Sequence, residues 1–134
     1  MKIDGACHCG NLSYVAEIDP ERVTICHCND CQRMSGSAFR VNAHADASTF
    51  TMTGEPAIYE RRAASGRTRL HAFCPRCGTN IYATGTGERA AALSLRTGTI
   101  NQRHQLRPAR QIWCDSAVEW SEVAGVERVA GDNR

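Results

Sequence analysis

Cysteine spacing constrains this chain more than any other feature. Its eight cysteines form three tight clusters, Cys7-x-Cys9, Cys26-x-Cys28-x-x-Cys31 and Cys74-x-x-Cys77, and one outlier, Cys114. Such spacings are typical of metal ligands, and seven thiols supply the four ligands of a closed tetrahedral zinc site with three left over. Three is the number of protein ligands at a zinc whose fourth position stays open for chemistry. The sequence therefore predicts two metal sites of different kinds.

Disulfide bonding is the main alternative use of these cysteines. The residues before Cys7 carry charges at positions 2 and 4 and have no apolar stretch, so they do not resemble a secretory signal peptide. A chain that remains in a reducing cytoplasm keeps its thiols free to bind metals. We therefore expect a cytoplasmic location, free thiols and bound zinc.

Composition and charge argue against several other classes of function. Fifteen arginines and one lysine oppose fourteen acidic residues, and the net charge of +2 comes without a block of like charges. This scatter argues against a nucleic-acid-binding arm. The apolar runs fall far short of the ~20 residues that cross a bilayer, so no membrane segment is expected. We expect one domain over residues 1–120 and a C-terminal tail, 121–134, that frays and holds no site.

Alternation of apolar and polar residues predicts a mainly β fold with little helix. Leu12 to Ile18 alternates before an expected turn at Asp19-Pro20, and Val23 to Cys26 then begins a second strand. Turn signals about every ten residues favour antiparallel pairing. The other expected strands are 38–43, 50–53, 57–61, 68–73, 80–84 and 91–96.

The geometry of a strand explains how a Cys-x-Cys motif could bind one ion. Residues i and i+2 of a strand face the same side, so the sulfurs of Cys7 and Cys9 can share a metal while His8 faces away. The same geometry applies to Cys26-x-Cys28 around His27. We therefore expect neither histidine to be a metal ligand, although His27 could orient the site or carry a proton.

The segment from Cys74 to Gly78 resembles a zinc knuckle, because Pro75 stiffens the turn and the glycine permits positive φ. Spacing alone leaves two divisions of the seven thiols open. In the first, a zinc ribbon formed by two CxxC pairs leaves three thiols unused, and its ligands are Cys28, Cys31, Cys74 and Cys77. In the second, a contiguous open trio remains, and the closed site consists of Cys7, Cys9, Cys74 and Cys77.

Three motifs occur in a fixed order: Gly5-Ala6-Cys7-His8-Cys9-Gly10, then Cys26-His27-Cys28-x-x-Cys31-Gln32-Arg33 with Ser35-Gly36, then Phe73-Cys74-x-x-Cys77-Gly78-Thr79. Between the last two lie Gly54, Tyr59, Ser65-Gly66 and Arg69. In order and spacing these residues resemble the family of glutathione-dependent formaldehyde-activating enzymes, whose domain is shared with centromere protein V. The resemblance runs from about Gly5 to Trp120.

The resemblance implies a β-rich fold of the Mss4-like type with two zinc ions per chain. It implies a structural site formed by Cys7, Cys9, Cys74 and Cys77, and a catalytic site formed by Cys26, Cys28 and Cys31, with glutathione or water as fourth ligand. The implied activity is that of a carbon-sulfur lyase of the S-(hydroxymethyl)glutathione synthase type, with glutathione and formaldehyde as partners. Two positions depart from the family pattern: Asn101 replaces the common aspartate, and Gln111 replaces the usual histidine.

Coordination chemistry supports the same reaction independently of the family. Three thiolates leave a zinc site with a net charge of −1, so the ion is a weak Lewis acid toward water and better suited to binding thiols. A thiol bound as fourth ligand loses its proton well below its usual pKa of ~8.5 and becomes a nucleophile that can attack an aldehyde. The alternative is a non-catalytic zinc-binding module for a protein partner, because a fold does not determine a function.

Arginines are the candidates for binding glutathione, which carries two carboxylates. Arg33 and Arg40 follow the second cysteine motif and could contact those carboxylates. The arginines around the expected hairpin turn at Ser65-Gly66 are more typical of a solvated sheet edge; they are Arg61, Arg62, Arg67 and Arg69.

The remaining histidines and the eighth cysteine stand outside these motifs. Cys114 follows an aromatic residue and is expected to be a partly buried small side chain rather than a nucleophile. The histidines without a motif around them are expected at the surface; they are His44, His71 and His104.

Overall fold

The structure is a computed structural model, and it describes residues 1–131. Its strands are β1 (Lys2–Ala6), β2 (Ser13–Cys26), β3 (Arg40–Asp46), β4 (Thr51–Thr53), β5 (Ala57–Arg62), β6 (Thr68–Phe73), β7 (Asn80–Thr84), β8 (Ala92–Arg96), β9 (Arg110–Ile112) and β10 (Glu127–Arg128). One α-helix, α1 (Asn29–Ser35), lies in the described range, and the 3-10 helices are η1 (Ala47–Thr49), η2 (Gly87–Ala91), η3 (Thr97–Thr99), η4 (Arg103–Gln105) and η5 (Cys114–Ser116). None of the helices between residues 1 and 131 has the length and apolar character of a bilayer-spanning helix.

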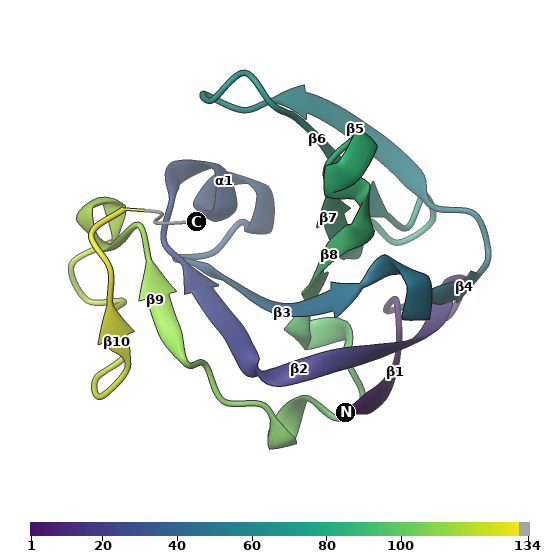
Figure 1. Ribbon diagram of the computed structural model, residues 1–134, viewed down its shortest axis with the longest axis horizontal. Helices are drawn as coiled ribbons and strands as arrows, with labels where there is room; N and C mark the ends of the chain where they lie inside the picture. The colour runs from purple at the N-terminus through teal and green to yellow at the C-terminus, as the bar shows by residue number, and fades with distance from the viewer. Residues whose placement is uncertain (132–134) are drawn as a thin grey trace.

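The strands form one curled sheet in the order β10-β9-β2-β3-β8-β7-β6-β5, and β1 and β4 pair with the first half of β2. In Figure 1 the sheet runs from β9 and β10 on the left, through β2 and β3, to β5 to β8 on the right, with α1 between the two arms. The prediction of a mainly β fold with little helix is confirmed. The sheet is mixed rather than antiparallel, because β9 pairs in parallel with both β2 and β10.

Strand β2 is longer than expected. The predicted turn at Asp19-Pro20 does not end a strand; it lies inside β2, where the register with β3 shifts between Ile18 and Val23. There the Asp19 carboxylate accepts a hydrogen bond from the Glu21 backbone N–H at 2.9 Å, which satisfies the donor locally. This irregularity lets the first half of β2 pair with β1 and β4 and its second half with β3 and β9.

The main hydrophobic core is formed largely by buried side chains of β1, β2, β3, β7 and β8. Along β2 the side chains of Tyr14, Ala16 and Ile18 are buried, and the residues between them are exposed, as the alternation predicts. A second, smaller buried cluster lies at the C-terminal end of β2, where Ile112 packs beside two cysteines. Its buried members are Cys26, Cys31 and Ile112, with Cys28 and Val129 packed against them.

The C-terminal segment is not frayed over the residues that the structure describes. The buried Gln111 side chain donates hydrogen bonds to the carbonyls of Val123 at 2.8 Å and Val126 at 3.3 Å, and accepts one from the Val123 N–H at 3.0 Å. The backbone of Val129 also bonds to Gln111. The expectation of a frayed tail is therefore wrong for residues 121–131, because one buried amide organises them; residues 132–134 lie outside the described range.

Candidate metal centres

Seven of the eight cysteines gather into two groups in space. Within each group the sulfur atoms all lie within 4.8 Å of one another. The four-cysteine cluster consists of Cys7, Cys9, Cys74 and Cys77, and the three-cysteine cluster consists of Cys26, Cys28 and Cys31. This grouping excludes the zinc-ribbon division and agrees with the one that the family resemblance implies. Cys114 is buried outside both clusters, with its sulfur 3.6 Å from the Gln111 carbonyl oxygen.

Both Cys-x-Cys motifs reach this arrangement by a route other than the expected strand. Cys7 to Cys9 lies in a turn after β1, and His8 is exposed. Cys26 is the last residue of β2, whereas Cys28 is the N-terminal cap of α1. A turn and a helix start therefore bring each pair of sulfurs together, not the alternation of a strand.

Two glycine-ended turns form the four-cysteine cluster. Gly10 and Gly78 both have positive φ, 82° and 78°, and donate backbone hydrogen bonds to the carbonyls of Cys7 at 3.2 Å and Cys74 at 2.8 Å. Positive φ is costly for residues with a side chain, which explains a glycine directly after each motif. The second turn is the knuckle expected between β6 and β7.

Neutral donors surround the sulfurs of the four-cysteine cluster. The Leu12 backbone N–H donates to the Cys7 sulfur at 3.2 Å. The Thr79 hydroxyl lies 3.2 Å from the Cys77 sulfur and lowers the pKa of that thiol to about 5. Such contacts favour the thiolate form, which is the form that binds a metal. Four cysteine sulfurs gathered in this way fit a closed tetrahedral zinc site.

Helix α1 positions the three-cysteine cluster. Cys28 has an extended backbone, φ −63° and ψ 156°, and its sulfur accepts the Cys31 N–H at 3.3 Å as a helix cap does. Gly36 ends the helix in the left-handed conformation, with its N–H on the Gln32 carbonyl. The Gln32 side chain donates hydrogen bonds to the carbonyls of His27 and Ser116. These bonds join α1 to the residue after β2 and to η5.

The three-cysteine cluster is buried against a cation. Cys26 and Cys31 are buried and Cys28 is half-buried. Arg40, opposite Cys26 in the β2–β3 register, donates from Nη2 to the Cys31 sulfur at 3.1 Å. Hydrogen bonds from the Cys26 and Cys28 thiols, aided by the Arg40 charge, hold the pKa of Cys31 well below its usual range. Hydrogen bonds with Cys28 and Cys31 raise the pKa of Cys26. In the metal-free cluster the three sulfurs therefore share protons through hydrogen bonds. A bound metal ion would displace those protons.

His27 is fully buried and turned toward Gln111 rather than toward a metal. Its Nε2 lies 2.9 Å from the Gln111 amide oxygen, which can only accept, so Nε2 carries the proton of this hydrogen bond. Gln111, where the family pattern has histidine, thus fixes both the His27 ring and the C-terminal segment. Asn101, the other departure, donates to the Asp4 carboxylate at 3.2 Å.

The sequence did not predict that a group of basic residues lies beside the three-cysteine cluster. His71, expected at the surface, is buried on β6 between Arg61 of β5 and Arg96 of β8. Arg61 donates from Nε to His71 Nε2 at 3.1 Å and pairs with Asp30 of α1 at 3.4 Å, so it is not a solvated edge residue. These residues lie on separate strands with no shared motif, so no local signal connects them.

Electrostatics in this group disfavour added positive charge. Burial, and then the charges of Arg96, Arg40 and Arg61, lower the pKa of His71 to about 3. His71 is therefore neutral near pH 7. Of the two arginines proposed for glutathione, Arg40 contacts the cysteine cluster, whereas Arg33 is exposed in the last turn of α1.

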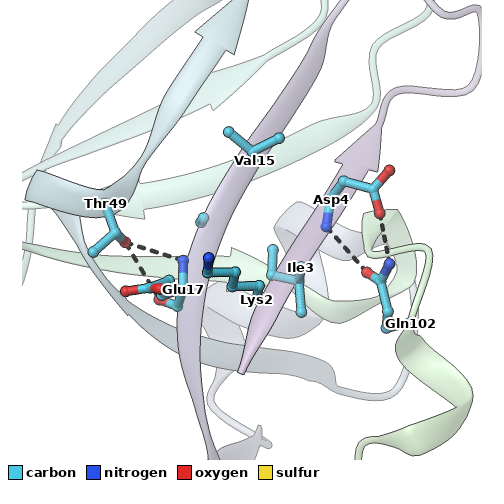
Figure 2. Close-up of a pocket in the computed structure, with 8 residues that line it drawn as sticks. Lys2, Ile3, Asp4, Val15, Glu17, Thr49 and Gln102 are labelled. Carbon is cyan, nitrogen blue, oxygen red and sulfur yellow. Dashed lines mark hydrogen bonds between the residues drawn. The ribbon is translucent and has the colours of Figure 1, made fainter.

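Two surface pockets do not coincide with either cluster. They have volumes of ≈ 510 and ≈ 520 Å³ and lie along β1 and β2, and no cysteine lines them. Figure 2 shows the first pocket, where Thr49 bonds to Glu17 and Gln102 bonds to Asp4. The donor chemistry of the thiols, rather than the shape of the surface, identifies the candidate site.

Comparisons with known proteins agree with these observations. The family model described as "Glutathione-dependent formaldehyde-activating enzyme" matches residues 2–116. A Halomonas elongata protein provisionally named as such an enzyme is 29% identical over 89 residues, which is 61% of this chain and 55% of that protein. A Schizosaccharomyces pombe protein named an uncharacterized lyase is 28% identical over 83 residues, 59% of this chain and 55% of that protein. The chain thus spans about half the length of these curated relatives.

A solved structure shows the same fold. The crystal structure of a Rhodobacter sphaeroides protein superimposes with a TM-score of 0.62, covering 94% of this chain and 99% of the other at 16% identity. At that identity the likeness concerns the fold alone. The family model, in contrast, matches most of the chain and includes all seven clustered cysteines. The chain therefore belongs to the family of glutathione-dependent formaldehyde-activating enzymes.

Proposed function

We propose that this chain is a zinc-dependent carbon-sulfur lyase-type enzyme that joins glutathione, or a similar thiol, to formaldehyde or a small aldehyde. The product with glutathione is S-hydroxymethylglutathione. Family membership supports glutathione-dependent formaldehyde activation in general. The observation that carries the proposal is the separation of a three-cysteine cluster, one sulfur short of a closed zinc site, from a complete four-cysteine cluster.

Each cluster has its own role in this proposal. The four-cysteine cluster would hold a structural zinc that stabilises the fold. The three-cysteine cluster would hold a catalytic zinc, which when bound favours the deprotonated form of a thiol in its open position. The soft sulfur donors and their spacing fit zinc in both places.

The reaction itself needs no oxidant or reductant. The thiol sulfur forms a bond to the aldehyde carbon, the π electrons of the carbonyl move to its oxygen, and that oxygen takes up a proton in place of the one lost by the thiol. The chain contributes the orientation of its ligands: Arg40 holds Cys31, and Gln111 holds His27 between Cys26 and Cys28. Arg40 and Arg33 remain the proposed contacts for the glutathione carboxylates.

Calorimetric titration of the zinc-loaded protein with glutathione tests the proposal. Cys28→Ser removes one sulfur of the three-cysteine cluster, yet serine can still cap α1, so the helix is retained. We expect glutathione binding by the wild type, its loss in Cys28→Ser, and no change in the control Cys114→Ser, which removes a buried thiol outside both clusters. NMR with ¹³C-formaldehyde would then follow the formation of the adduct.

Two results would contradict the proposal. Glutathione binding that survives in Cys28→Ser would show that the cluster is not the binding site. A wild-type protein that holds two zinc ions but binds no glutathione would favour the non-catalytic zinc-binding module.

A further inference from the structure

Two buried guanidinium groups beside the three-cysteine cluster have donors without acceptors. Arg40 and Arg96 are only 7% and 6% exposed. Among the described residues, Nε and Nη1 of Arg40 and Nε of Arg96 find no hydrogen-bond partner although they are enclosed. Buried polar atoms are nearly always paired in folded proteins, so three such N–H groups at one place call for an acceptor from outside the chain.

The neighbouring His71 does not supply enough acceptors. A neutral imidazole has one acceptor nitrogen, and two guanidinium groups approach this ring: Arg61 at Nε2, 3.1 Å away, and Arg96 at Nδ1, 3.3 Å away. One of these N–H groups therefore faces another donor. The shortage of acceptors extends from Arg40 through Arg96 to His71.

Negative charge is also short at this place. Arg61 pairs with Asp30 and Arg128 with Glu122, whereas neither Arg40 nor Arg96 takes part in an ion pair with a described residue. The Arg40 guanidinium instead contacts the Cys31 sulfur. A zinc ion and three thiolate ligands together carry a net charge of −1. The two buried guanidinium groups carry +2, so one positive charge is left unmatched. An unmatched buried charge is costly, and an anionic ligand would remove that cost.

We propose that Arg40 and Arg96 form an anion-binding subsite that accepts one negatively charged group of the thiol substrate beside the three-cysteine cluster. This inference rests on the proposed function and names the group that the site selects. The charge belongs either to the thiolate that completes the cluster or to a carboxylate of the same molecule. Both are strong acceptors for guanidinium N–H groups. Anionic ligands are therefore preferred over neutral ones of similar size.

Arg96 is the better residue to change, because Arg40 contacts a proposed metal ligand directly. Arg96→Met removes the charge and keeps much of the side-chain length, whereas Arg96→Lys keeps the charge. Arg107→Met removes one positive charge from an exposed loop and controls for net charge. Elemental mass spectrometry and circular dichroism first establish that each variant keeps its zinc and its fold. If Arg96→Met does not fold, the comparison of Arg96→Lys with the wild type takes its place.

Calorimetry with three ligands distinguishes the two sources of charge. Glutathione offers a thiol and carboxylates, 2-mercaptoethanol offers only a thiol, and S-methylglutathione offers only carboxylates. If the thiolate occupies the subsite, Arg96→Met weakens glutathione and 2-mercaptoethanol alike, by roughly tenfold or more. If a carboxylate occupies it, glutathione and S-methylglutathione weaken while 2-mercaptoethanol does not. Arg96→Lys is expected to retain part of the affinity, and Arg107→Met all of it.

Equal affinities of Arg96→Met and the wild type for all three ligands would overturn the subsite, even if glutathione binds well. Absence of glutathione binding by the wild type would instead overturn the proposed function. The subsite is then decided by acetate alone: we expect acetate to raise the melting temperature of the wild type more than that of Arg96→Met. An equal rise in both would reject the subsite.

Discussion

The two cysteine clusters differ in how their negative charge is balanced. At the four-cysteine cluster, neutral groups such as the Leu12 N–H and the Thr79 hydroxyl contact the sulfurs. At the three-cysteine cluster, the charged guanidinium of Arg40 contacts a sulfur, and a second buried arginine, Arg96, lies near it. Four thiolates complete the shell of a zinc ion, whereas three thiolates beside two cations leave space and charge for one more ligand.

The two sites therefore differ in the groups around their sulfurs and not only in their number of cysteines. The four-cysteine cluster joins two turns that belong to the main core, to which Cys7 and Cys74 contribute. The three-cysteine cluster lies in the smaller core at the end of β2. We therefore expect the fold to depend on the first cluster and ligand binding to depend on the second.

Loss of a ligand from the four-cysteine cluster is expected to have the largest effect. Cys74→Ser should unfold the domain, because structural zinc contributes on the order of 10 kcal/mol to the folding of small zinc domains. Far-UV circular dichroism and thermal melting measure this, with Cys114→Ser as the matched control. A Cys74→Ser variant that melts like the wild type would remove the distinction between the clusters.

Loss of a ligand from the three-cysteine cluster should leave the fold intact. We expect Cys26→Ser to lose one zinc ion per chain and to weaken glutathione binding at least about 100-fold, because even residues that only support a metal ligand can contribute that much to affinity. Elemental mass spectrometry and calorimetry measure the two losses. Collapse of this variant to the same extent as Cys74→Ser would make both clusters structural.

Removal of the Gln111 amide should loosen the three-cysteine side of the molecule selectively. Gln111→Leu leaves the buried Nε2–H of His27 and the backbone groups of Val123 without partners, which is expected to cost about 2 to 4 kcal/mol. Hydrogen exchange should accelerate at residues 121–131 and at α1, while the four-cysteine turns keep their protection. Uniform acceleration across the chain would contradict a selective role.

Acid should weaken the fold through His71. The pKa of His71 is about 3 in the folded chain, below the ordinary ~6.5. Between these two pH values the unfolded chain binds a proton at His71 and the folded chain does not. The contribution of His71 is therefore complete above pH ~6.5 and is lost as the pH falls toward 3, at up to ~1.4 kcal/mol per pH unit. Denaturant unfolding of the wild type and His71→Asn should show a steeper pH dependence in the wild type. Parallel profiles would show that His71 protonates freely when folded.

The ion pair between α1 and β5 should have the smallest effect. Asp30 is mostly exposed, so Asp30→Asn is expected to change the free energy of unfolding by less than about 1 kcal/mol. The salt dependence of the denaturation midpoint should decrease slightly. A loss of glutathione binding in this variant would mean that the position of α1 depends on the pair.

Local patterns predicted much of this fold. Alternation located β6 and β7 at their observed bounds and β8 within one residue. It missed α1, because a helix of seven residues is too short to show a repeating pattern of apolar positions. Gly36, directly after its last residue, is the one local signal of a helix end. It also missed the parallel pairing of β9, because alternation carries no information about strand direction.

The surroundings of the three-cysteine cluster lay beyond sequence reasoning. Spacing and family resemblance indicated the cysteines, and the carboxylates of glutathione suggested Arg33 and Arg40, of which Arg40 contacts the cluster. These considerations gave no signal for Arg96 and His71, which lie on β8 and β6 and meet across β7, the strand between them. Similarly, one buried amide at Gln111 orders the C-terminal segment, and no composition rule identifies such a contact.

Zinc content per chain, measured by elemental mass spectrometry with and without glutathione, tests the central claim most directly. The wild type is predicted to hold about two zinc ions, with glutathione protecting one of them against a chelator, and Cys28→Ser about one that glutathione does not affect. One zinc ion per wild-type chain, held equally with and without glutathione, would contradict the assignment of two clusters to two roles.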